Sequence, residues 1–503
     1  MLFRKKRVVT IAFFVAIFVF LFSFFRFVTP VTVFDTDDWT YIAYSRDAFP
    51  TTREWNPTRI LPEIVMPVLG FIAAFVVTPL TGDYLGAVNT VFVTGIALGI
   101  IAYLATFAWA MKKAFHLSQI STMATTLLFL VAHFWAFRSE NVGNMYLLYA
   151  KDLTCYFYYT LPTIFNGMLV ILLEERPHLW EEAGPIQKGF LVLAVYLAVC
   201  SNMFCSIVIA VYCGIVSLFR IVVKALVKKS WNTFCTAMIE NRFYVATLGW
   251  WLISLVFEVS GARAESVGLN GKISGIKQTM RYFGDVLQST NVLFQGFCIG
   301  VILLTVICLF VQYRQKKQNE DDYNVIRKML LFMLAAAIVA IYQILLCGVT
   351  GLSYYMLSGD VLISVYFYIF AAVFAAMGYL MWKVPRCQVA IPLLICVAIF
   401  NCNTFWNTYQ TPGHYKTSNS EAVIQISEDI YRQIIEGNAK KKDTLEICVP
   451  DYREEGNENN WPLTTSYLGE RLARTLYKHG QIDSLMEIRI IPDSRLNDFY
   501  HID

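Results

Sequence analysis

Residues 1–41, MLFRKKRVVTIAFFVAIFVFLFSFFRFVTPVTVFDTDDWTY, decide the fold class of this chain. Residues 8–28 are apolar, and a helix needs about 20 such residues to cross a bilayer. The basic residues 4–7 precede this run, which predicts that the N-terminus stays in the cytoplasm. A cleaved signal peptide would have a shorter apolar core and a small-residue cleavage site, whereas this run ends in Phe-Phe-Arg-Phe at 24–27. We therefore expect a retained membrane anchor.

The composition extends this expectation to the whole chain. Of its 503 residues, 57 % are hydrophobic and 16 % are charged, whereas soluble proteins carry about 25 % charged residues. The sequence therefore predicts a polytopic α-helical protein whose partner is a lipid bilayer, and it excludes a cytosolic enzyme or a secreted disulfide scaffold. The net charge of +4 is too small to indicate a nucleic-acid partner. The 12 cysteines are scattered without a CxxC pair, as expected of small buried hydrophobes rather than a zinc site.

Apolar runs recur along the chain and predict eleven spans. These are residues 8–28, 84–111, 117–137, 159–174, 188–201, 204–223, 243–259, 291–313, 327–349, 361–382 and 388–405. A twelfth apolar run, 64–80, contains Pro67 and Pro79 and is short. It could cross the membrane, but crossing alone would move Lys112 and Lys113 outside. We therefore favour an interfacial or re-entrant helix for this segment.

Alternation of the eleven spans places the C-terminus outside the cell membrane. Basic clusters at 4–7, 112–113, 224–229 and 314–317 then fall inside, as the positive-inside rule requires. The transmembrane domain covers residues 1–405, with large outer loops at 31–83 and 260–290. Gly261, Gly268, Gly271, Gly275 and Gly284 lie in the second of these loops, which favours a mobile loop that orders over a ligand.

The last part of the chain, residues 406–503, has shorter apolar runs and more charge. Its periodicity predicts a helix over 419–436, a strand over 444–449, a helix over 462–479 and a strand over 486–491. We expect a small extracytoplasmic α/β domain there.

The densest group of polar residues near the membrane is Asp35, Asp37 and Asp38, in the string DTDDWTY. Three crowded carboxylates beside an apolar wall need a cation or a raised pKa. They suit a general base or a metal ligand. The alternative is a hydrated loop that ends the first span and caps the next helix. Asp35 lies nearest the span, so it is the best candidate for a cap, whereas Asp37 and Asp38 point to different sides. Trp39 and Tyr41 suit stacking on sugar rings, or a place in the interfacial aromatic belt.

The predicted outer loops also carry excess arginine. Arg53 and Arg59 lie in the first loop, and Arg263 and Arg281 in the later one. Guanidinium groups match phosphate oxygens, so these residues could hold a lipid phosphate or pyrophosphate. The alternative is ion pairing with nearby acids such as Glu63 or Glu265.

The predicted architecture resembles that of the GT-C superfamily of membrane glycosyltransferases. The shared features are a cytoplasmic N-terminus, one span, an acidic outer loop, many further spans and an outward tail. The motif that carries the resemblance is DTDDWTY, which is similar to that of bacterial branches with Asp-Asp near the first span. The chain lacks the WWD-type motif of oligosaccharyltransferases.

The resemblance implies a sugar donor on a polyprenyl phosphate and a glycan or lipid-linked acceptor outside the membrane. Asp37 or Asp38 would deprotonate the acceptor hydroxyl, and the sugar would transfer with inversion. Arg263, or an arginine of the first loop, would stabilise the leaving phosphate. Trp39, Tyr41 and Glu258 would contact the sugar or acceptor.

No cofactor other than this donor is implied, and the need for a divalent metal ion stays open, because some members of the superfamily use one. The alternatives are a transporter or flippase of a lipid-linked glycan, and a non-catalytic scaffold for an envelope polymer.

Overall fold

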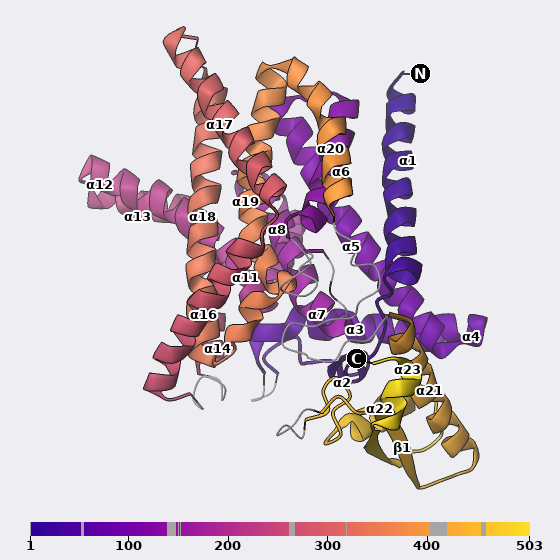
Figure 1. Ribbon diagram of the computed structural model, residues 1–503. Coiled ribbons are helices and arrows are strands. Elements are labelled where there is room, and N and C mark those ends of the chain that lie inside the picture. The colour runs from indigo at the N-terminus through magenta and orange to yellow at the C-terminus, as the bar shows by residue number, and fades with distance from the viewer. Residues whose placement is uncertain are drawn as a thin grey trace.

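The computed structural model describes residues 2–51, 55–137, 147–148, 150, 152–260, 267–317, 319–402, 420–453 and 459–502. Each of the eleven predicted spans contains a helix in this part of the chain, and the helices run side by side in one bundle (Figure 1). The bundle helices are α1 (Leu2–Ser23), α5 (Tyr84–Phe115), α6 (Gln119–Trp135), α8 (Leu161–Glu175), α10 (Pro185–Val199), α11 (Met203–Ser217), α14 (Arg242–Val259), α17 (Val292–Arg314), α18 (Glu320–Thr350), α19 (Gly359–Lys383) and α20 (Ala390–Asn401).

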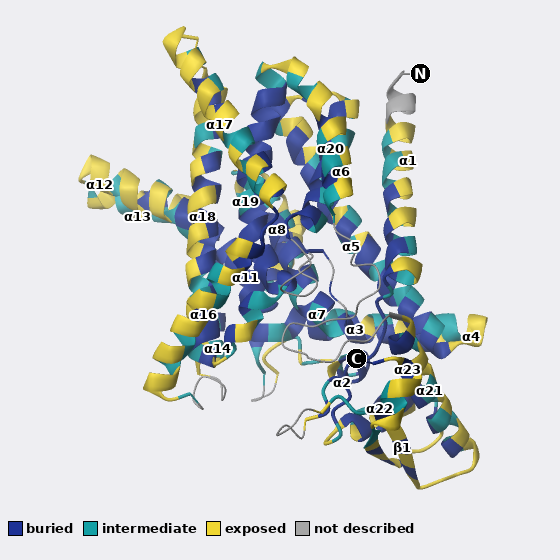
Figure 2. Cartoon of the chain, viewed as in Figure 1, coloured by how far each residue is buried: buried dark blue, intermediate teal, exposed yellow. Residues whose placement is uncertain are grey.

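The length and surface of these helices identify a multi-pass membrane protein. Nine helices of the described chain are long and apolar enough to cross a membrane, and three further apolar helices are shorter. Large apolar side chains on the outside of the bundle, such as Phe20, Leu303 and Leu304, are more than half exposed. Figure 2 shows exposed residues along α1 and α17, whereas α19 is buried along most of its length. Such an apolar surface on the outside of the bundle requires lipid around it.

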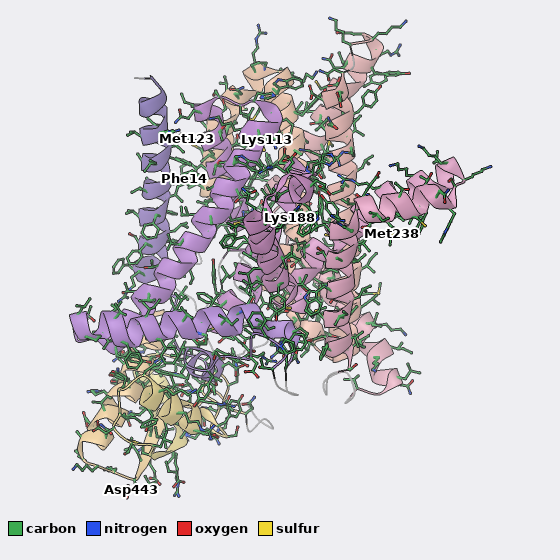
Figure 3. The ribbon with its side chains drawn as sticks, turned by 180° about the vertical axis from the view of Figure 1, so that it is seen from behind. Phe14, Lys113, Met123, Lys188, Met238 and Asp443 are labelled. Carbon is green, nitrogen blue, oxygen red and sulfur yellow. The ribbon has the colours of Figure 1, made fainter. Side chains whose placement is uncertain are left out.

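The segment between the first two bundle helices is not an open loop. It contains α2 (Thr36–Tyr41), a 3₁₀ turn (Pro57–Arg59), α3 (Ile60–Ile72), a π-helical turn (Ala73–Val77) and α4 (Thr78–Thr81). The last four form one rod that lies across the end of the bundle, crosswise to α1 (Figure 3). Its length and composition would also suit a span. The crosswise position agrees with the interfacial helix expected for residues 64–80.

The prediction of a mobile loop at 260–290 is wrong for most of this segment, because α16 (Leu269–Ser289) is a helix packed against α18. Glycine serves close packing here rather than flexibility. A Cβ atom added at Gly275 would lie 2.5 Å from the carbonyl oxygen of Gly348. The Thr279 hydroxyl donates to the Ser353 hydroxyl at 2.9 Å, which joins α16 to the 3₁₀ turn Ser353–Leu357. Residues 261–266 lie outside the described part.

A helical arm leaves the bundle where the sequence indicated only a basic connection. The chain continues from α11 through a π-helical turn (Leu218–Val223) into α12 (Lys224–Lys228), then returns along α13 (Trp231–Glu240). The arm projects sideways in Figure 1. Short elements complete the bundle: α7 (Leu153–Cys155), a π-helical turn (Tyr156–Thr160), α9 (Leu179–Glu182) and a 3₁₀ turn (Pro385–Val389).

The tail has the expected order of elements. It consists of α21 (Ser420–Ala439), β1 (Thr444–Pro450), α22 (Leu468–Lys478), β2 (Glu487–Asp493) and α23 (Arg495–Tyr500). The two strands pair in parallel from Thr444 opposite Glu487 to Pro450 opposite Asp493, so α22 is the crossover that parallel strands need. The tail lies at the end of the bundle remote from the N-terminus (Figure 1).

Candidate functional site

The acidic segment forms the first turn of α2, and its three carboxylates have different surroundings. Asp35 is the N-cap, and its side chain accepts a hydrogen bond from the Asp37 amide at 2.7 Å. Asp38 completes the capping box, because its Oδ2 accepts from the Asp35 amide at 3.2 Å and the Phe34 amide at 3.0 Å. The predicted capping role of Asp35 is therefore confirmed.

Asp38 also joins α2 to the bundle. Its Oδ1 accepts hydrogen bonds from the amide and the hydroxyl of Thr154, both at 2.7 Å, and the residue is fully buried. Burial, and then the nearby Asp152, raise the pKa of Asp38 to about 7, whereas the hydrogen bonds from Thr154 and Phe34 favour the carboxylate. Burial, and then Asp38 and Asp152, raise the pKa of Asp35 as well. Asp38 is thus a buried structural group, although the sequence made it an equal candidate for the base.

Asp37 is the exposed member of the three. It lies close to Tyr41, one turn further along α2. Burial raises the pKa of the Tyr41 hydroxyl, the Asp37 and Glu63 carboxylates add to the rise, and Arg59 opposes it. Burial and Asp37 also raise the pKa of Tyr467 in the tail. Asp37 is therefore close both to Tyr41 of its own helix and to Tyr467 of the tail.

Arg59 approaches the same phenol from the crosswise rod. Its guanidinium carbon lies 6.0 Å from the centre of the Tyr158 ring, and the Tyr41 and Tyr158 rings are 4.9 Å apart. Tyr159 and Glu258 are its other neighbours that can carry negative charge. Among the described residues, Arg59 has no ion pair within 4.0 Å. Arg46 differs, because its Nε and Nη2 donate to Glu63 at 2.5 and 3.1 Å.

The other residues predicted for the site are dispersed. Trp39 is only 1 % exposed, so no face of its ring is open to a sugar, and its expected contact role is lost. Glu258 is half-buried near Arg59, as a contact residue of this site would be. Arg281 is exposed on α16, which Figure 1 draws on the opposite side of the lower end of the molecule from α2. Arg53 and Arg263 lie outside the described residues.

The tail covers α2, and sequence reasoning missed this contact. The Thr36 amide and hydroxyl donate to the Pro462 carbonyl at 3.1 and 2.9 Å, and the Thr464 amide donates to the Thr36 hydroxyl at 3.1 Å. The Thr475 hydroxyl donates to the Trp39 carbonyl. Threonine has no special spacing in this segment, so the sequence offered no signal for the interface. It also missed Asp152, which is the N-cap of α7. Aspartate is a common N-cap residue, so its place just before Leu-Thr-Cys was a signal that could have been used.

No group of three or more His, Cys, Asp or Glu side chains in the described part of the chain is arranged to hold a metal ion. Comparison of the chain with protein-family models, curated proteins and solved structures finds no match. The arrangement of Asp37, Tyr41 and Arg59 is therefore the feature of this chain that points to a function.

Proposed function

We propose that this protein is a membrane glycosyltransferase that moves a sugar from a polyprenyl phosphate to a glycan or lipid-linked acceptor on the outer face of the cell membrane. The observation that supports the proposal is that Asp37 and Arg59 both lie close enough to the Tyr41 phenol to act on its pKa. An exposed carboxylate and a guanidinium that forms no ion pair with the acids of the described chain are the two groups that direct displacement of a lipid phosphate requires.

In the proposed reaction, the carboxylate of Asp37 takes the proton of the acceptor hydroxyl. The acceptor oxygen attacks the anomeric carbon from the face opposite the phosphate. The new C–O bond forms as the bond to the phosphate oxygen breaks, so the configuration inverts. The electron pair leaves with the polyprenyl phosphate, and Arg59 stabilises the added negative charge.

The site favours the glycosyltransferase over the two alternatives. A transporter needs charged or polar groups along a path through the bundle, whereas Asp37 and Arg59 belong to α2 and the crosswise rod at one end of it. A scaffold would need the α2–tail interface but not the Asp37 carboxylate. A substitution at Asp37 therefore discriminates between catalysis and scaffolding.

The test is to incubate the purified protein with labelled polyprenyl-phosphate sugars and a lipid-linked glycan acceptor, and to measure release of the polyprenyl phosphate. We expect Asp37→Asn to lower turnover by about 10²–10⁴, the usual contribution of a general base. Arg59→Gln should also slow release, whereas Arg281→Gln should not, because α16 is remote from α2. Glu446→Gln on the exposed face of β1 is the control for loss of an acid. Wild-type turnover by Asp37→Asn would refute the mechanism.

A further inference from the structure

The helical arm, residues 218–240, packs mainly on itself. Its two buried residues are Ile221 and Ala237, which are 2 % and 1 % exposed and lie in the two halves that pack together. The arm projects from the bundle in both Figure 1 and Figure 3, and Figure 2 shows it exposed along most of its length. The surface of the arm is therefore open to its surroundings.

The first half of the arm is amphipathic. Arg220, Lys224 and Lys228 follow one another at intervals of four residues, so they share one face of the helix. Exposed apolar side chains occupy the other side, and these are Phe219, Val222, Val223, Leu226 and Val227. A helix with one cationic and one apolar face is typical of a segment that lies in the plane of a membrane interface.

The second half of the arm repeats this pattern. In α13, the residues at helical spacing on one face are apolar or weakly polar, namely Trp231, Phe234, Cys235, Met238 and Ile239. Trp231 is 74 % exposed and Ile239 is 67 % exposed. The Trp231 and Phe234 rings stack with centres 5.0 Å apart, close to the turn between the two helices. Tryptophan is enriched at the interface between membrane and water, so its exposure here favours contact with lipid.

The charge of the arm has one sign over most of its length. Residues 218–239 contain four basic residues and no acidic residue. Glu240 comes next and pairs with Lys224 at 3.5 Å. Lys228 and Lys229 are exposed at the turn between α12 and α13, and neither forms an ion pair with an acid of the described chain. The tip of the arm thus combines two unpaired cations with exposed apolar side chains.

We propose that the arm binds the headgroups of anionic phospholipids, with its apolar side chains in the leaflet beside the bundle. The phosphate of an anionic lipid complements Lys228 and Lys229, whereas a zwitterionic lipid also brings an ammonium group that these lysines repel. The exposed apolar side chains favour a lipid surface over an acidic soluble partner, because lipid already surrounds the bundle from which the arm projects. The arm lies away from α2 in Figure 1, so this binding does not depend on the proposed function.

The test uses Trp231 as a reporter at the tip of the arm. The full-length protein and its Trp231→Phe variant are reconstituted into phosphatidylcholine vesicles that contain a brominated lipid, which quenches tryptophan on contact. The difference in fluorescence between the two proteins isolates Trp231 from the other tryptophans. Brominated phosphatidylglycerol and brominated phosphatidylcholine are compared at the same mole fraction. We expect the anionic lipid to quench Trp231 with at least about fivefold higher affinity, the factor that one lysine contributes near an anionic surface.

The same comparison in Lys228→Gln/Lys229→Gln, with and without Trp231→Phe, should show most of this preference lost. The matched control is Lys440→Gln/Lys442→Gln, which removes the same charge from exposed positions in the tail and should keep the preference. Equal quenching by the two brominated lipids in the wild type would overturn the charge argument. Quenching of Trp231 by neither lipid would overturn the placement of the arm in the leaflet and would point to a soluble acidic partner instead.

Discussion

At the scale of the residue, the adjacent aspartates Asp37 and Asp38 have different roles: Asp38 stabilises the structure, and Asp37 is the proposed base. Asp38 accepts four hydrogen bonds in a buried place, whereas Asp37 is exposed one position earlier. A helix turns by about 100° per residue, so the side chains of Asp37 and Asp38 point in different directions, and when one is buried the other can be exposed. The orientation of α2 after its N-cap, Asp35, therefore decides which of the two aspartates is exposed.

We predict that Asp38→Ala destabilises the protein much more than Asp37→Ala. The Asp38 change leaves the Phe34 and Thr154 amides without their acceptor, and each buried unsatisfied group costs about 1–3 kcal/mol. The Asp37 change should stay within about 0.5 kcal/mol, as at most surface positions. Thermal unfolding in detergent measures both. Equal midpoints for the two variants would contradict the structural role of Asp38.

At the scale of the element, the contact between the tail and the bundle is sensitive to protonation of His479. Its Nδ1 lies 2.7 Å from the Tyr84 hydroxyl, and burial lowers the pKa of His479 to about 4. The ordinary pKa is about 6.5, so between pH 6.5 and 4 the unfolded chain binds more protons than the folded one. The stabilisation from this neutral histidine is full above pH 6.5 and declines as the pH falls towards 4.

We therefore predict that the thermal midpoint of the wild type falls more steeply from pH 6.5 to pH 4 than that of His479→Gln. Glutamine does not titrate, and all other groups are common to both proteins. Parallel pH profiles would show that His479 is not held neutral at the interface between α22 and the bundle.

The packing of α16 on α18 gives a second prediction at this scale. Gly275→Ala should destabilise the protein by about 1–3 kcal/mol, because the new methyl group overlaps the Gly348 carbonyl. Gly284→Ala in the same helix meets no atom within 4 Å and should be neutral or stabilising by up to about 1 kcal/mol. Unfolding midpoints of the two alanine variants measure the difference, and a stable Gly275→Ala would argue against this close approach.

At the scale of the whole molecule, the distribution of basic residues predicts a cytoplasmic N-terminus and an external tail. Two native cysteines test it, because Cys448 is exposed in the tail and Cys235 is exposed on the arm predicted inside. In chains that retain one of the two, a membrane-impermeant maleimide should label Cys448 in intact cells and Cys235 only after permeabilisation. The reverse pattern would place the Asp37 site in the cytoplasm.

The sequence predicted the bundle and the tail well because both depend on local periodicity. The runs that form α1, α17 and α18, and the strand–helix–strand pattern after residue 440, carry their own signal. The glycines of α16 led to the wrong prediction of a loop, because the contact between Gly275 and Gly348 joins residues 73 positions apart and leaves no local signal. The burial of Trp39 was hidden for the same reason, since its cover comes from the tail.

The contact between Thr36 and Pro462 has a consequence for the assembly of the protein during synthesis. A ribosome makes the α2 segment early and the residues that cover it more than 400 positions later. If the tail is external, it must also be exported before the two can meet. The site around α2 therefore reaches its final packing only when translation is nearly complete, so a stalled or prematurely terminated chain would leave Trp39 and the acidic turn uncovered and open to quality-control proteases.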